Sequence, residues 1–153
     1  MIGVWVLLGA LVIAGVAGWW LRANNGRVRV SAAQPTARPT SSPADALPEP
    51  IRAALDPAAA VTLVQLSTTF CTSCRQAGKL LTSFAADTDG VSHVELDITD
   101  EPSVATKVGV MRTPTTLALA ADGTELLRVG GVPKPGTLLD ALRPHLAPSS
   151  PSA

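Results

Sequence analysis

The sequence is poor in aromatic rings and in cysteine. It has no Tyr; three Trp lie within the first twenty residues, and the only later aromatic residues are Phe70 and Phe84. A soluble core must therefore be built from Ala, Val, Leu and Ile, which favours short buried strands covered by small helices. The two cysteines exclude a small secreted scaffold held by several disulfides and leave the cellular compartment open.

Neither sign of charge is in excess. Twelve basic and twelve acidic residues give a net charge of zero, so the composition offers neither a nucleic-acid-binding surface nor an acidic tail. A zinc site would need two ligands besides the two cysteines, and no second Cys pair accompanies the two histidines, His93 and His145. We expect no nucleic-acid partner, no metal and no cofactor.

The first apolar run is long enough to cross a membrane. From Ile2 to Leu21 there is no charge, and twenty such residues match a hydrocarbon core about 30 Å thick. Trp lies near both ends of the run, and Arg22 closes it. A buried core helix would have a polar face, and a cleaved signal peptide would begin with basic residues. The pattern predicts a transmembrane anchor over residues 1–22.

The charges around this run predict its orientation. Arg22, Arg27, Arg29 and Arg38 follow it, whereas only the amino group of Met1 precedes it. The positive-inside rule therefore places the rest of a single-pass membrane protein in the cytoplasm. One span gives the rule little to average over, so an extracytoplasmic location stays open as the alternative.

Three further segments follow the anchor. Residues 23–50 are rich in Pro, Ser, Thr and Ala and predict an extended linker; within them Arg27–Val30 alternates like a short edge strand. Residues 51–146 carry regular apolar patterns and form the predicted domain. Residues 147–153 are too small and polar to pack, so we expect a disordered tail.

The sequence pattern of the domain predicts alternating strands and helices. Apolar β-branched runs predict strands, and Asp122-Gly123 predicts a hairpin turn between the last two. Leu80, Leu81 and Phe84 are expected to face inward from one helix, and Asp100 to cap the next. The order indicates an α/β fold with a mixed sheet and helices on both faces. The predicted strands are Val61–Leu66, Val91–Ile98, Thr115–Ala120 and Glu125–Val129; the predicted helices are Ile51–Leu55, Cys71–Ala86, Glu101–Val108 and Pro135–His145.

The motif Cys71-Thr72-Ser73-Cys74 carries the predicted chemistry. It follows a predicted buried strand and opens a helix, which is where a CxxC pair performs redox work. A thiolate at a helix N-terminus is stabilised by free N–H groups and the helix dipole. The second sulfur lies one turn deeper on the same face, close enough to close a small disulfide ring.

From Val61 to Leu146 the chain resembles thioredoxin. The resemblance is carried by VTLVQLSTTFCTSC, by VELDITDEPSVATKVGVMRTPTTLALAADGTELLRVGG and by a final amphipathic helix. It implies a thioredoxin-like fold, with Cys71 as nucleophile and Cys74 as resolving thiol. It also implies that Pro114 is a cis-proline beside the disulfide, that Thr113 pairs with an extended substrate segment, and that Gly130 lines the substrate groove.

The sequence departs from the family pattern at four places. Phe70 replaces the usual Trp before the first Cys, and Thr72-Ser73 replaces the frequent Gly-Pro. Gln65 occupies the position of a buried Asp that accepts the resolving thiol's proton, and Glu95 that of its Lys partner. Either the carboxylate has moved across the strand pair, making Glu95 a candidate proton acceptor, or Glu95 points to solvent.

These features favour a membrane-tethered oxidoreductase that exchanges dithiol and disulfide with protein substrates. Its partners would be disulfide-containing proteins and an unidentified reductant. Two alternatives stay open: a tethered binding module with idle cysteines, which the missing Trp and Asp favour, and an oxidase of thiols outside the cell. The sequence identifies neither the substrates nor the electron donor.

Overall fold

The computed structural model describes residues 2–24, 27–30 and 43–146. The chain begins with the long helix α1 (Ile2–Asn24) and the strand β1 (Arg27–Val30). The elements that follow are η1 (Pro43–Ala46), α2 (Glu49–Ala53), β2 (Val61–Ser67), α3 (Thr72–Ala86), β3 (Val91–Asp97), α4 (Pro102–Lys107), β4 (Thr115–Ala120), β5 (Glu125–Gly130), α5 (Pro135–Leu142) and η2 (Arg143–His145).

Five strands form one mixed sheet in the order β1-β5-β4-β2-β3. β2 runs parallel to β3, with Gln65 opposite Glu95, and antiparallel to β4, with Gln65 opposite Thr116. β5 pairs antiparallel with β4 and, on its other side, with β1. The predicted mixed sheet and the predicted edge strand Arg27–Val30 are confirmed.

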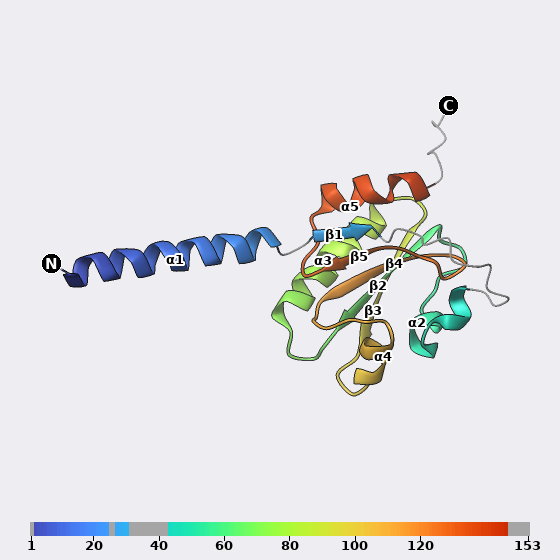
Figure 1. The fold of residues 1–153 in the computed structure, drawn as a ribbon. Helices are drawn as coiled ribbons and strands as arrows, with labels where there is room; N and C mark the ends of the chain where they lie inside the picture. The colour runs from blue at the N-terminus through green and yellow to red at the C-terminus, as the bar shows by residue number, and fades with distance from the viewer. Residues whose placement is uncertain (1, 25–26, 31–42, 147–153) are drawn as a thin grey trace, which may run out of the picture.

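Helices cover both faces of the sheet (Figure 1). On one face α3 and α5 bury Leu81, Leu138 and Leu142 against β2, β4 and β5. On the other, α2 and α4 bury Ile51 and Val104 in a second cluster. Every residue of β2 is buried, because this central strand is covered on both faces. The strand thereby fixes the position of the loop that follows it.

Most predicted elements lie within two residues of their predicted bounds, and the differences have local causes. α2 begins at Glu49 because Pro50 fits the first turn of a helix. The predicted Asp100 cap is wrong: Glu101 is the N-cap residue of α4, and no side chain caps it. The last helix ends as an α-helix at Leu142 and continues as the 3-10 turn η2, because Pro144 has no N–H to donate.

α1 extends away from the sheet, and its side chains from Trp5 to Trp20 are all exposed (Figure 1). Within the residues that the structure describes, no helix is long and apolar enough to cross a membrane. The described parts of the predicted linker 23–50 contain the end of α1, β1, η1 and the start of α2. The rest of that linker, 31–42, and the predicted tail 147–153 lie outside the described residues.

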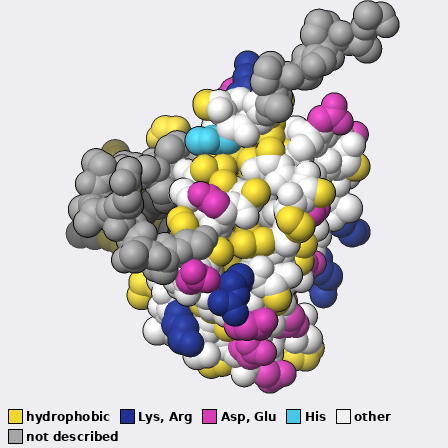
Figure 2. All heavy atoms as spheres, turned by 90° about the vertical axis from the view of Figure 1, so that its right-hand side faces the viewer, with side chains coloured by type: hydrophobic (Ala, Val, Ile, Leu, Met, Phe, Trp, Pro, Cys, Tyr) yellow, Lys and Arg dark blue, Asp and Glu magenta, His cyan; other side chains and the backbone are white. Residues whose placement is uncertain are grey.

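The space-filling view of one face shows basic and acidic side chains of both signs lying close together toward its lower edge (Figure 2). Most of the visible apolar atoms lie above these charges, across the middle of the face. This face therefore offers no broad surface of one sign, in agreement with the zero net charge.

Candidate active site

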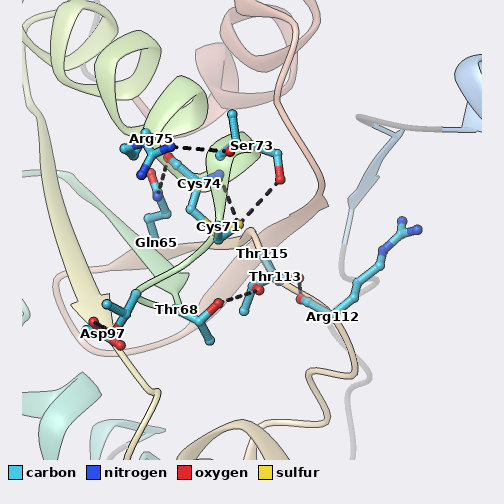
Figure 3. Close-up of a disulfide and its surroundings, with 12 residues drawn as sticks. Gln65, Thr68, Cys71, Ser73, Cys74, Arg75, Asp97, Arg112, Thr113 and Thr115 are labelled. Atoms are coloured by element: carbon cyan, nitrogen blue, oxygen red, sulfur yellow. Dashed lines mark hydrogen bonds between the residues drawn. A yellow bond between two sulfur atoms is a disulfide. The ribbon is translucent and has the colours of Figure 1, made fainter.

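Cys71 and Cys74 form a disulfide at the N-terminus of α3, with their Cα atoms 5.1 Å apart (Figure 3). Cys71 is the N-cap residue, with φ −105° and ψ 100°, and its Sγ accepts a hydrogen bond from the Cys74 N–H at 3.1 Å. A sulfur thus takes the place of the oxygen that usually caps a helix. The same N–H can stabilise a thiolate on Cys71 once the disulfide is reduced.

The two cysteines differ in their access to solvent. Cys71 is half-buried, whereas Cys74 is only 2% exposed. One hydroxyl lies beside the outer sulfur, with Ser73 Oγ 3.4 Å from Cys71 Sγ. The neighbouring Thr72 Oγ1 accepts a hydrogen bond from the Arg75 guanidinium at 3.3 Å. An incoming group can therefore reach Cys71 and not Cys74.

Gln65 lies fully buried beneath the disulfide. Its Nε2 donates to the Cys74 carbonyl at 3.0 Å and to Glu95 Oε1 at 3.2 Å. Both partners are acceptors, so the NH2 of the amide must face them, and the reverse orientation would place three oxygens together. The Gln65 side chain thereby connects the resolving cysteine to a carboxylate on the neighbouring strand.

Gly78 makes this arrangement sterically feasible. A Cβ at Gly78 would lie 3.2 Å from Glu95 Oε2 and 3.6 Å from Gln65 Oε1. The glycine in the middle of α3 costs about 1 kcal/mol relative to Ala, and here it leaves room for both polar side chains under the helix. The sequence left two interpretations of Glu95, a proton acceptor or a side chain in solvent, and the first stays a prediction. The residue as a whole is exposed, yet its carboxylate reaches back to Gln65.

The loop before β4 lies on the other side of the disulfide. The Thr113–Pro114 peptide bond is cis, as the resemblance predicted. Thr113 Oγ1 lies 3.3 Å from Thr68 Oγ1, which joins this loop to the one that precedes Cys71 (Figure 3). The Pro114 carbonyl accepts from the Gly131 N–H at 2.8 Å, so the end of β5 is held against the same loop.

Asp97 organises the loop from Thr68 to Phe70. Its carboxylate accepts a hydrogen bond from Thr69 Oγ1 at 3.2 Å and further bonds from Thr99. These hydrogen bonds, those from Thr99 first, lower the pKa of Asp97 below its ordinary value. The loop presents Phe70 with 97% of its surface exposed, so the ring stands free beside Cys71.

Two residues near the disulfide escaped the sequence analysis. Arg112 lies against Gly130, where a Cβ would meet its Nη2 at 2.7 Å. Gly78 was also missed, although a glycine inside a helical pattern is itself a signal of close packing. No sequence signal indicated Arg112, because its contact joins segments eighteen residues apart.

The histidines lie away from the cysteines. His93 Nδ1 lies 3.1 Å from Thr82 Oγ1 on the outer part of α3, and His145 belongs to η2. In the described part of the chain, no three His, Cys, Asp or Glu residues are grouped so that they could hold a metal ion. Neither histidine shares a site with the disulfide.

The family model described as Thioredoxin matches residues 49–143. The chain belongs to the thioredoxin family. It is 33% identical to a thioredoxin of Staphylococcus saprophyticus over 87 residues, which cover 56% of this chain and 83% of that relative. A thioredoxin of Staphylococcus aureus is 34% identical over 87 residues, with the same coverage of this chain and of the relative.

Solved thioredoxin structures agree with the fold. Thioredoxin NaTrxh from Nicotiana alata is 28% identical, with a TM-score of 0.50, covering 57% of this chain and 74% of its own. A single-site mutant of a thioredoxin from Halobacterium salinarum is 22% identical and has a TM-score of 0.56, covering 71% of this chain and 99% of its own; that likeness concerns the fold alone. Together with the Cys71–Cys74 disulfide, family membership identifies the chain as a thioredoxin-type protein-disulfide oxidoreductase.

Proposed function

We propose that this protein is a membrane-tethered reductase of protein disulfides. The observation that carries the proposal is the asymmetry of the disulfide at the start of α3: Cys71 is accessible, and Cys74 is buried behind it. A nucleophile needs access to its substrate, whereas a resolving thiol needs access only to the nucleophile.

The reaction follows from this asymmetry. In the reduced protein the Cys71 thiolate attacks one sulfur of a substrate disulfide, and the other substrate sulfur leaves as a thiolate. Cys74 then loses its proton and attacks Cys71 Sγ, which releases the second substrate sulfur. The product is the Cys71–Cys74 disulfide seen here, and a separate reductant must return two electrons to it.

We propose that Glu95 accepts the proton that Cys74 loses before it attacks Cys71. Support comes from the shared amide of Gln65, which binds the Glu95 carboxylate and the Cys74 carbonyl at once. Gln65 itself cannot take the proton, because an amide is not basic. In this assignment Gln65 is a positioning residue and Glu95 the proton acceptor.

We assign substrate binding to the surface around the cis-proline. Thr113 and Pro114 form one side of it and Gly130 another, and the free ring of Phe70 lies beside Cys71. Thr113 lies just before β4 rather than within it. An extended substrate segment can therefore approach its backbone next to the disulfide.

The tether we propose is α1, with the catalytic domain on the cytoplasmic side. The structure describes the side chains from Trp5 to Trp20, and all of them are exposed. The uncharged run Ile2–Leu21 is longer than that stretch at both ends. A C-terminal alkaline phosphatase fusion should be inactive and a green fluorescent protein fusion bright. The opposite pair of results would place the domain outside the cytoplasm and favour thiol oxidation there.

The reductase itself is tested by reduction of insulin. The full chain in mild detergent should accelerate the precipitation of insulin by dithiothreitol, and the variant in which both cysteines are replaced by Ser should not. Equal rates for the two proteins would favour a binding module with idle cysteines. A measured reduction potential near that of strong thiol oxidants would instead favour the oxidase.

A further inference from the structure

Arg112 is a cation in the wall of the proposed substrate groove. It directly precedes Thr113, and its guanidinium lies over Gly130, within 2.7 Å of the place that a Cβ would occupy. The absence of a side chain at Gly130 therefore gives the guanidinium its position. Figure 3 shows the Arg112 side chain extending away from the two sulfurs, on the side of the disulfide opposite Arg75.

Among the residues that the structure describes, no neighbour neutralises the charge of Arg112. Among the described residues the ion pairs are Arg128 with Glu125 and Arg143 with Asp140, and no carboxylate pairs with Arg112. The carboxylate of Asp97, on the other side of the disulfide in Figure 3, is already held by Thr69 and Thr99. The exposed guanidinium retains donors for a carboxylate outside this chain.

Two exposed apolar side chains, Met111 and Phe70, lie in the segments that contain Arg112 and Cys71. Met111, which precedes Arg112 in the sequence, is 98% exposed. Phe70, which precedes Cys71, is 97% exposed. Exposed Met and Phe offer adaptable contact area to a partner segment. The segments beside the disulfide thus carry exposed apolar side chains and, at Arg112, a positive charge that pairs with no carboxylate among the described residues.

We propose that Arg112 is a specificity-determining residue, which favours substrates with an acidic residue close to the reactive cysteine. The inference rests on the proposed reductase function and names the class of substrate for that same groove. Arg112 acts on encounter and orientation, because it touches neither sulfur. We therefore expect Arg112 to change the rate at which Cys71 attacks the substrate disulfide, and not the rate at which the mixed disulfide is released.

Matched peptides test the proposal. Each carries a fluorophore and a quencher separated by one disulfide, and the set differs only by Asp, Asn or Lys at one to three residues from the cysteine. The reduced full chain in detergent is mixed with each peptide, and the second-order rate of fluorescence release is measured at low and at high salt. The Asn peptide provides the rate without charge.

At low salt the Asp peptide should react roughly two to five times faster than the Asn peptide at the favoured position, as expected for an exposed ion pair. The Lys peptide should react more slowly, and high salt should compress the series. In Arg112→Gln the ratio of the Asp to the Asn rate should fall to about one, and in Arg112→Glu the order should reverse. Lys79→Gln, which removes an exposed cation from α3, should keep the parent ratio.

Two outcomes would overturn the proposal: equal rates for the Asp and Asn peptides with the parent protein at every position, or an unchanged ratio in Arg112→Gln. Arg112→Lys guards against a structural explanation, since it keeps the charge and should retain part of the preference. If the parent protein reduced none of the peptides, the proposed function itself would be contradicted.

Discussion

At the scale of the residue, the unusual feature of this site is the pair Gln65 and Glu95. The buried position on the central strand holds an amide, and the carboxylate comes from the neighbouring strand. A buried carboxylate is costly unless it is paired, whereas Glu95 is exposed to solvent. The Gln65 amide thus links a carboxylate to the Cys74 carbonyl without that carboxylate being buried.

The first prediction concerns Glu95→Gln. The substitution preserves the acceptor for Gln65 Nε2 and removes the base. Release of the mixed disulfide at pH 7 should slow by roughly 10²-fold or more, the range of general base assistance. Single-turnover kinetics with a substrate peptide measure this step. Asp89→Asn, which removes an exposed carboxylate after α3, should not alter it. An unchanged rate in Glu95→Gln would leave water as the acceptor.

The second prediction concerns His93 and pH. Burial lowers the pKa of His93, and the charge of Glu95 opposes this in part. The folded protein therefore binds the proton less readily than the unfolded chain, whose histidine has a pKa of about 6.5. The contribution of His93 to stability is full above that value and is lost as the pH falls through the lower, folded pKa.

Urea unfolding measured between pH 8 and pH 5 tests this sign. The parent protein should lose stability as the pH falls below about 6.5, and His93→Gln should show a shallower slope over that interval. Gln can still bond to Thr82, so the comparison isolates the proton. Parallel slopes would show that His93 is not responsible for the pH dependence.

At the scale of the element, the β4–β5 turn holds η1 in place. The Ala44 N–H donates to the Asp122 carbonyl at 3.1 Å. Gly123 has φ +85°, and a Cβ there would lie 2.6–2.8 Å from backbone and side-chain atoms of Ala44. Because the nearest atoms are backbone, they cannot rotate aside. The turn tolerates only glycine for two reasons, conformation and space.

Gly123→Ala is therefore expected to destabilise the domain by more than the 1–2 kcal/mol of a left-handed residue alone. Gly90→Ala is the matched control: its φ is +79°, but the nearest atom, Ala60 Cβ, is an ordinary 3.5 Å away. Urea unfolding of both variants separates the clash from the backbone strain. Equal losses of stability would mean that η1 moves aside at no cost.

Elements were predictable where one signal dominated. Buried runs such as Val61–Leu66 and the helix after Cys71 follow from apolar period and length. The prediction of Asp100 as the N-cap was wrong because the neighbouring Glu101 is also acidic, and the sequence alone does not show which of the two takes the N-cap backbone conformation. The contact of Glu95 with Gln65 depends on how side chains turn under α3, and the position of Arg112 depends on the long-range pairing of β4 with β5.

At the scale of the whole molecule, β1 links the proposed tether to the groove. Only residues 25 and 26 separate α1 from β1, so the Cα atoms of Asn24 and Arg27 are at most roughly 11 Å apart. Arg27 pairs with Gly130 at the edge of the sheet. If α1 is the tether, as proposed above, the substrate groove would lie close to the membrane surface.

The most direct measurement of the central claim is trapping in cells with the full chain. Cys74→Ser keeps the accessible nucleophile and removes the thiol that expels the substrate, so it should accumulate dithiothreitol-sensitive complexes of higher mass. Cys71→Ser leaves only a buried thiol, 2% exposed in the parent, and should capture almost nothing. Equal trapping by both variants, or by neither, would contradict the assignment of Cys71 as nucleophile and Cys74 as resolving thiol.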